Sequence, residues 1–185
     1  MIRLRPALWP TLVSLPILVL SLGLGIWQME RREWKRDILD RIAANQAAAP
    51  ISLDELLRGD PLRHEYGKVK LGGTFLFDKE FFLAARSLKN KVGHQVVVPL
   101  KTDDGRVVLF DRGWIPQERK DPARRAEGQP AGQVELIGVV RRNQERRQFA
   151  PENVPDKNVW FHVDVPLMRK MAGAPPDPKL DTFFL

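Results

Sequence analysis

The residues best placed for chemistry near the start of the chain are Gln28, Arg31 and Lys35, in the segment GIWQMERREWK. They are three and four residues apart, so a helix would place them on one face, close to the ring of Trp27. Two interpretations fit this face. Arg31 and Lys35 are interfacial anchors that extend towards lipid headgroups, or the face contacts a membrane partner or its cofactor.

A second candidate is Arg112, in the segment LFDRGWIP from Leu109 to Pro116. The pattern predicts a strand that leads into a tight turn at Asp-Arg-Gly, where Gly113 permits a backbone conformation that other residues resist. Trp114 would then point into the core, so Gly113 and Trp114 are expected to be structural. An arginine beside a tight turn is well placed to bind a carboxylate, which makes Arg112 a candidate for ligand contact.

The sequence shows no pattern typical of an enzyme or a metal site. Its three histidines, His64, His94 and His162, lack the spacing of metal ligands. There is no cysteine, which excludes disulfides, thiolate nucleophiles, cysteine metal sites and the usual two-cysteine covalent attachment of haem. A nucleophile elbow, a phosphate-binding glycine loop and a convincing carboxylate pair are also missing. The sequence therefore predicts a protein that acts by binding.

An uncharged run from Ala7 to Gln28 precedes these candidates and would position the first of them. About twenty apolar residues cross the roughly 30 Å hydrocarbon core of a bilayer as a helix. A cleaved signal is the alternative, but no cluster of small residues marks a cleavage site just after the run. We therefore predict a retained membrane anchor over residues 1–30. Basic residues flank both ends of the run. A bare positive-inside count favours a cytoplasmic location for the remaining chain, but because both ends are basic it does not decide the topology.

The chain carries 30 basic and 23 acidic residues, a net charge of +7. The densest basic runs are Arg124-Arg125, Arg141-Arg142 and Arg146-Arg147. Such a balance suits anionic lipid headgroups or an acidic partner. A nucleic-acid partner is not expected, because the sequence lacks a helix-turn-helix pattern, an RNP-like aromatic motif and zinc ligands.

Hydrophobic periodicity predicts a helical juxtamembrane segment over 31–64 and a β-rich domain over 65–185. In the first, Trp34, Ile38 and Ile42 recur at helical spacing, and Ser52 with Glu55 forms a capping box. In the second, alternating patterns and turn signals predict strands over 68–77, 80–87, 94–101, 106–110, 133–141, 159–165 and 182–185, with a short helix over 166–172. Trp160 and His162 would share one face of the strand over 159–165. This spacing is typical of a mainly antiparallel barrel or sandwich.

Four segments of this chain resemble the Surfeit locus protein one family of cytochrome oxidase assembly factors. The segment GIWQMERREWK is similar to the family motif at the end of its first membrane helix, and Gly93 to Leu100 is similar to a G-x-x-V-x-x-P-L strand. DRGWIP stands where the family usually has NRGWVP, so Asp111 replaces an asparagine. FAPENVPDKNVWFHVD resembles a fourth, less compact motif that ends on Trp160 and Asp164.

The resemblance implies a β-rich domain between two membrane helices, facing the periplasm or the intermembrane space from an inner (cell) membrane. This implied topology overrides the charge count.

Such a protein would assist the delivery of haem a to the large subunit of cytochrome c oxidase or its assembly intermediates. The second, C-terminal transmembrane helix, with a histidine proposed as haem ligand, is expected beyond Leu185 and is absent from this chain, so no axial ligand is transferred. A stably bound accessory subunit that never handles haem is the alternative. The matching positions are Trp27, Gln28, Arg31, Lys35, Gly93, Arg112, Gly113, Trp114, Pro116, Trp160 and Asp164.

Overall fold

The structure is a computed structural model that describes residues 8–143, 146 and 148–185. It divides into a helical unit that ends at Ala44 and a β unit that spans Asn45–Leu185.

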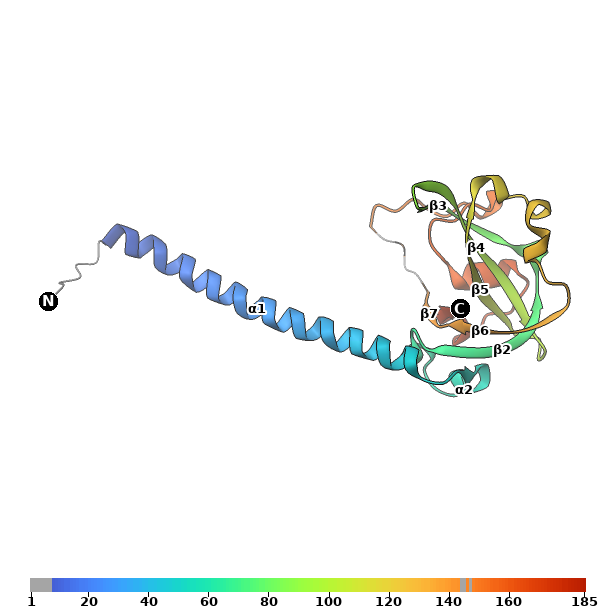
Figure 1. The fold of residues 1–185 in the computed structure, drawn as a ribbon, viewed down its shortest axis with the longest axis horizontal. Helices are drawn as coiled ribbons and strands as arrows, with labels where there is room; N and C mark the ends of the chain where they lie inside the picture. Colours follow the sequence, from blue (N-terminus) through green and yellow to red (C-terminus); the bar gives the residue numbers. More distant parts are fainter. Residues whose placement is uncertain (1–7, 144–145, 147) are drawn as a thin grey trace. The chain divides into compact units, whose positions relative to one another are not determined.

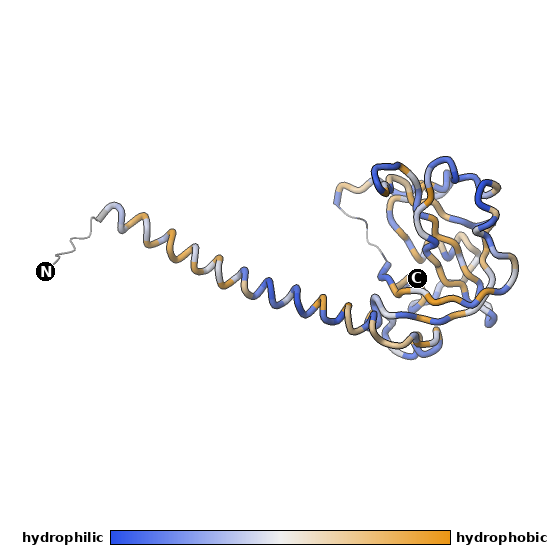
Figure 2. Tube along the Cα trace, viewed as in Figure 1, coloured by the Kyte–Doolittle hydropathy of each residue, from blue (hydrophilic) through white to orange (hydrophobic). Residues whose placement is uncertain are grey.

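The first element is one continuous helix of 40 residues, α1 (Leu8–Ala47), with Pro16 inside it (Figure 1). Its first half is apolar and its second half is strongly hydrophilic (Figure 2). At a rise of 1.5 Å per residue the helix is about 60 Å long, so its apolar half alone matches a bilayer core. The apolar side chains are exposed, including Leu20 at 72%. By length and composition this helix can cross a membrane.

The β unit is built on a six-stranded sheet that is antiparallel except for one short pair (Figure 1). Its strands are β1 (Ile51–Ser52), β2 (Lys68–Phe75), β3 (Phe81–Leu88), β4 (Lys91–Thr102), β5 (Val107–Pro116) and β6 (Gln133–Val139). The central strand β4 pairs with β2, β3 and β5, while β2 also pairs with β6 and, in parallel, with β1. The predicted mainly antiparallel β domain is therefore confirmed.

The sheet does not close into a barrel, because β5 and β6 are not paired within the described residues. A second, two-stranded sheet of β7 (Arg141–Arg142) and β8 (Phe183–Phe184) lies between them. The next residue, Leu185, donates its backbone N–H to the Leu109 carbonyl at 2.9 Å and accepts from the Asp111 N–H at 2.6 Å. The last residues of the chain thus link β7 to β5 through two hydrogen bonds rather than through a continuous ladder.

Two short α-helices begin where the sequence provides a capping side chain. The Ser52 hydroxyl accepts from the Glu55 N–H at 3.1 Å and starts α2 (Leu53–Arg58), as the capping box predicts. The Asp164 carboxylate accepts from the Leu167 N–H at 3.1 Å and starts α3 (Val165–Met171). Short 3-10 helices complete the domain: η1 (Pro61–His64), η2 (Phe77–Lys79), η3 (Gln117–Arg119), η4 (Pro122–Gly128), η5 (Pro155–Lys157) and η6 (Leu180–Thr182).

Both faces of β4 are covered by hydrophobic side chains. Val96, Val98 and Leu100 pack into one core cluster together with Leu56 of α2. Val97 faces the other way, into a second cluster with Met168 of α3. Alternating side chains point to opposite faces of a strand, so a strand that is apolar at every position can fill two cores at once.

Two predictions of strands are wrong: one strand does not form, and another continues beyond its predicted end. The strand expected over 159–165 is reduced to isolated bridges, Leu83 with Trp160 and Val154 with Val159. The Asn153 side-chain oxygen accepts hydrogen bonds from the backbone N–H groups of Phe161 and His162. These two groups are therefore not available for a ladder of strand hydrogen bonds. The strand expected to end at Phe110 continues to Pro116, because Asp-Arg-Gly forms a β-bulge within β5 instead of a turn.

Candidate functional site

The polar-aromatic face at the end of the apolar run is present on α1. Trp27, Gln28, Arg31 and Lys35 are all exposed, and they fall on one side of the helix. The Arg31 guanidinium carbon lies 5.1 Å from the centroid of the Trp27 ring, which is a cation–π contact. The structure thus fixes the geometry of this face, and its role in ligand or partner contact stays a prediction.

Arg112, the second predicted contact residue, is the extra residue of the β5 bulge. Its guanidinium carbon lies 4.7 Å from the centroid of the Phe75 ring and 5.8 Å from that of Phe77. One Nη donates to the Gly128 carbonyl at 2.7 Å. Arg112 therefore does not stand beside a tight turn, and in the β unit it holds a loop against two aromatic rings.

Gly93, Trp114 and Pro116 form one packed group where β4 and β5 pair. Gly93 lies opposite Pro116, and a Cβ at this position would overlap the Ile115 carbonyl oxygen and reach within 2.6 Å of the Trp114 ring. Gly113 adopts a φ of +95°, which a glycine accepts without strain. Trp114 is only half-buried and donates its indole N–H to the Arg86 carbonyl at 3.3 Å, so it does not reach the core as predicted.

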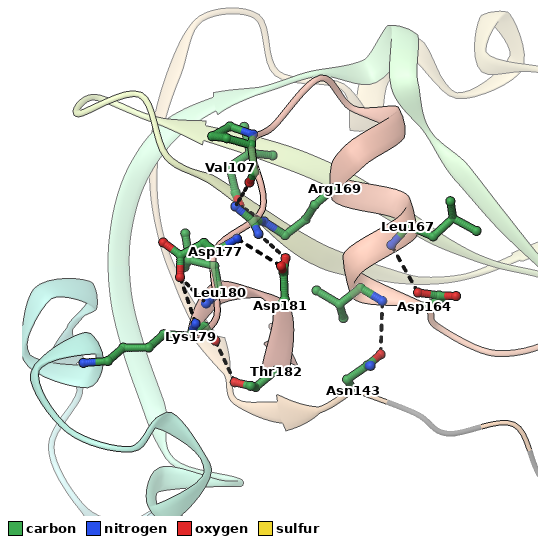
Figure 3. Close-up of polar contacts among 12 residues, drawn as sticks. Val107, Asn143, Asp164, Leu167, Arg169, Asp177, Lys179, Leu180, Asp181 and Thr182 are labelled. Atoms are coloured by element: carbon green, nitrogen blue, oxygen red, sulfur yellow. Dashed lines mark hydrogen bonds and ion pairs between the residues drawn. The ribbon is translucent and has the colours of Figure 1, made fainter.

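Trp160 and Asp164 belong to the last of the matching segments, FAPENVPDKNVWFHVD, and both stabilise the fold. Trp160 is fully buried, edge-on to Phe81 at 5.4 Å, and its indole N–H donates to the Asn158 side chain at 2.9 Å. Asp164 is the N-cap of α3, a contact that Figure 3 shows. Both side chains are committed to internal contacts.

A cleft of about 780 Å³ lies on the β unit, and we call it the arginine cleft. It is lined by Glu65, Ala84, Ala85, Arg86, Gln95, Arg141, Arg142, Asn143, Ala150, Pro151, Phe161 and His162. Two irregular strand pairings adjoin Gln95: β3 shifts register between Leu83 and Arg86, and β5 shifts opposite Val96 and Val97. Bulges of this kind redirect side chains and are common beside functional sites.

Among the described residues, the arginine cleft carries three cations, Arg86, Arg141 and Arg142, and one carboxylate, Glu65. The basic run Arg141-Arg142 thus lines the cleft. By contrast, Arg125 forms a two-contact ion pair with the buried Glu80, and Arg146 pairs with Glu152 at 2.9 Å. Sequence reasoning noted the Arg141-Arg142 run but missed its convergence with Arg86 and Gln95, because strand pairing brings these segments together.

Asp111, beside the cleft, has an unusual environment for a carboxylate. It accepts from the Gln95 side-chain amide and from the Gly113 N–H, the latter at 2.9 Å. Burial raises the pKa of the Asp111 carboxyl, while those two hydrogen bonds and the charges of Arg141 and Arg86 oppose that rise. Burial is the larger effect, so the site favours a neutral acceptor over an ionised carboxylate.

Replacing Asp111 by asparagine should raise the thermal unfolding midpoint at pH 7. The pKa of the Asp111 carboxyl is higher in the folded protein than in the unfolded chain, where it has the ordinary value of about 3.9. The wild type therefore loses stability as the pH rises above that ordinary value. The asparagine variant lacks this loss. The difference between the two proteins should therefore shrink towards zero below about pH 4.

Thermal unfolding followed by circular dichroism at several pH values measures this effect. The control is Asp156→Asn, at an exposed position, which should unfold like the wild type at each pH. An Asp111→Asn protein that is less stable than the wild type at pH 7, or equally stable at every pH, would contradict the argument.

The histidines do not form a metal site in the part of the chain that the structure describes. His64 is exposed. The ring nitrogens of His94 are buried against Phe82, and burial, followed by the charge of Lys120, lowers the pKa of this side chain. His162 is the one histidine that lines the arginine cleft.

Comparison with known proteins gives consistent similarities across most of the chain. The sequence model of the SURF1 family matches residues 15–183. The chain is 34% identical over 174 residues to Surfeit locus protein 1 of Mus musculus, which covers 84% of this chain and 56% of that protein. It is 34% identical over 183 residues to Surfeit locus protein 1 of Homo sapiens, covering 89% and 60%. A SURF1-like protein of Monosiga brevicollis is 33% identical over 180 residues, covering 91% and 68%. The chain spans little more than half the length of the first two relatives.

Proposed function

The chain belongs to the SURF1 family, and from that premise we propose that it is a membrane-anchored assembly factor for a haem-copper cytochrome c oxidase. In this proposal α1 crosses the inner (cell) membrane and the β unit faces the periplasm or the intermembrane space. The partner is the large oxidase subunit or its assembly intermediates, in contact with membrane lipid. The protein acts by binding rather than by catalysis.

The cargo in this proposal is haem a, which is held transiently during its delivery to the large subunit. The observation that carries it is the order of side chains along α1, where an exposed apolar surface ends in an exposed polar-aromatic face. A haem has the same order of chemistry, an apolar macrocycle with two propionates at one edge. Arg31 and Lys35 would pair with propionates, and the Trp27 ring would pack beside them. No axial ligand is assigned in this chain.

Deletion of the gene tests the function as a whole. We expect the oxidase of the deletion strain to lack haem a, measured by reduced-minus-oxidised difference spectra of the membranes, and reintroduction of the gene to restore it. A normal haem a content in the deletion strain would remove the proposal. If the protein instead purifies stoichiometrically with mature, active oxidase, it is the accessory subunit that the sequence left as the alternative.

The double variant Arg31→Gln/Lys35→Gln tests the polar-aromatic face. A charge-assisted hydrogen bond contributes about 1.5–3 kcal/mol, so losing the propionate partners should weaken the binding of haem a at least about tenfold. Titration of the purified protein in detergent with haem a measures this. The matched control is Arg36→Gln, which removes a cation one residue after Lys35, about 100° around the helix. Equal losses in both proteins would show a general charge effect and contradict the assigned face.

A further inference from the structure

We propose that the arginine cleft is a second binding site, for an organic anion that carries a carboxylate on an apolar body. The site lies wholly within the β unit and is independent of the face on α1. Its residues come from β3, β4, β7 and the segment 150–162, so it exists only in the folded domain.

The first argument is the charge balance of the cleft. Neither Arg86 nor Arg141 forms an ion pair within the described residues. Arg141 instead stacks on the Tyr66 ring at 4.9 Å. Arg142 forms a long ion pair with Glu65, in which the Arg142 Nε lies 3.7 Å from the Glu65 Oε2. The Asp111 carboxyl lies near enough for the charges of Arg141 and Arg86 to oppose the rise of its pKa that burial causes, but it forms no ion pair with either of them within the described residues. The planar guanidinium fork matches a carboxylate in two parallel hydrogen bonds, so these arginines are suited to an anion supplied from outside.

The second argument is a pair of polar atoms that are closed off from solvent and have no hydrogen-bond partner among the described residues. They are the Nε of Arg86 and the Nδ1 of His162, and both residues line the cleft. One Nη of Arg86 donates to the Phe161 carbonyl at 3.3 Å, and the other ring nitrogen of His162 lies 3.3 Å from the Asn153 amide nitrogen. Buried polar atoms without a partner are rare and costly, and a bound ligand is one way to satisfy them.

The third argument is the backbone that holds Arg86. The preceding residue, Ala85, adopts a φ of +54°, in the left-handed region that non-glycine residues seldom occupy. Residues held in such strained conformations are concentrated at ligand sites. This irregularity in β3 lies opposite Gly93 to Gln95 of β4 and comes directly before Arg86, which lines the cleft.

The rest of the lining decides the class of anion. The remaining lining combines polar side chains with carbon surface. The polar side chains are Glu65, Gln95, Asn143 and His162, and the carbon surface comes from Ala84, Ala85, Ala150, Pro151 and Phe161. A volume of about 780 Å³ lies within the usual range for sites that enclose an organic molecule. A carboxylate with an apolar body satisfies both parts of the lining. The same chemistry has two sources, a porphyrin propionate and a fatty acid.

Binding of the full 185-residue chain in uncharged detergent tests the proposal. The probes are metal-free protoporphyrin and laurate, each compared with its methyl ester by equilibrium dialysis. We expect at least one acid to bind about tenfold or more tightly than its ester, since each paired charge contributes about 1.5–3 kcal/mol. Binding of only one acid identifies the source. If neither acid binds better than its ester, the proposal is wrong.

Variants assign that preference to the cleft. In the Arg31→Gln/Lys35→Gln background, which removes the propionate partners assigned on α1, Arg86→Gln and Arg141→Gln should each remove most of the preference for the acid. Arg86→Lys, which keeps the charge, should retain part of it. Arg119→Gln, at an exposed arginine paired with Glu127, should bind like the wild type. If Arg86→Gln fails to fold, Arg141→Gln, at an exposed side chain, carries the test. An unchanged preference in Arg141→Gln would overturn the proposal.

The outcome is separable from that of the proposed function. Arg31→Gln/Lys35→Gln should leave the preference of the cleft for the acid intact, because Arg31 and Lys35 belong to α1 and do not line the cleft. A deletion strain with normal haem a content would remove the assembly function and leave the binding of laurate or protoporphyrin by the cleft unaffected.

Discussion

Replacing Arg169 by methionine is expected to destabilise the β unit by about 3–5 kcal/mol, the usual cost of removing one partner of a buried ion pair. Arg169 is 2% exposed and extends from α3 towards the strand that carries Val107 (Figure 3). Its Nε donates to the Val107 carbonyl at 2.9 Å, one Nη donates to the Pro175 carbonyl at 3.3 Å, and the other Nη pairs with Asp181. Methionine fills a similar volume but leaves all three acceptors without this donor.

Chemical unfolding of the full chain in detergent, followed by near-ultraviolet circular dichroism, measures the loss. The matched control is Arg119→Met, because Arg119 is exposed and its partner Glu127 lies at 3.5 Å; a surface pair of this kind contributes at most about 1 kcal/mol. The double variant Arg169→Met/Asp181→Asn should recover part of the loss, since it no longer leaves an unpaired carboxylate. Equal stability of Arg169→Met and the wild type would refute the role given to this pair.

Replacing Trp160 by alanine should cost a similar amount, about 3–5 kcal/mol, because it removes a large ring from a closed core. Trp160 is completely buried and packs edge-on against Phe81 in the second core cluster. Its backbone also bridges to β3, with the Trp160 N–H donating to the Phe82 carbonyl at 3.1 Å. The truncation therefore leaves a cavity at the point where the segment before α3 is attached to the sheet.

The same unfolding measurement applies, with two comparison variants. Trp160→Phe keeps an aromatic contact with Phe81 and should lose clearly less stability. Trp34→Ala removes a tryptophan that is 61% exposed on α1 and should leave the unfolding of the β unit unchanged. The prediction fails if Trp160→Ala and Trp34→Ala unfold at the same denaturant concentration.

The elements that are specified by local patterns were predictable from sequence. The uncharged run up to Gln28 predicts a long apolar helix, and α1 is that helix. Ser52 and Glu55 predict the start of α2, and alternation predicts β2, β4 and β6 to within a few residues. Each of these signals acts between residues that are neighbours in the chain, so no knowledge of strand pairing is needed.

The predictions failed where local chemistry resembles two structures. Asp-Arg-Gly suits a turn and also a bulge, and only the pairing of β5 with β4 selects the bulge. The alternating pattern over 159–165 resembles a strand, but the side chain of Asn153 takes two of its backbone N–H groups. In the first case a paired strand decides the conformation, and in the second a side chain eight and nine residues earlier in the chain decides it.

The sequence by itself determined the apolar helix, the polar-aromatic face at its end, the β-rich character of the remainder and the family resemblance. These follow from periodicity, capping and motif spacing, which are local properties of the chain. Only the tertiary structure decided that Arg86, Gln95, Arg141 and His162 meet in one cleft, and that Arg112 is held by Phe75, Phe77 and Gly128. The physical reason is strand register. A shift of one residue turns a side chain to the other face of the sheet, and the bulges that set this register form only when the strands pair.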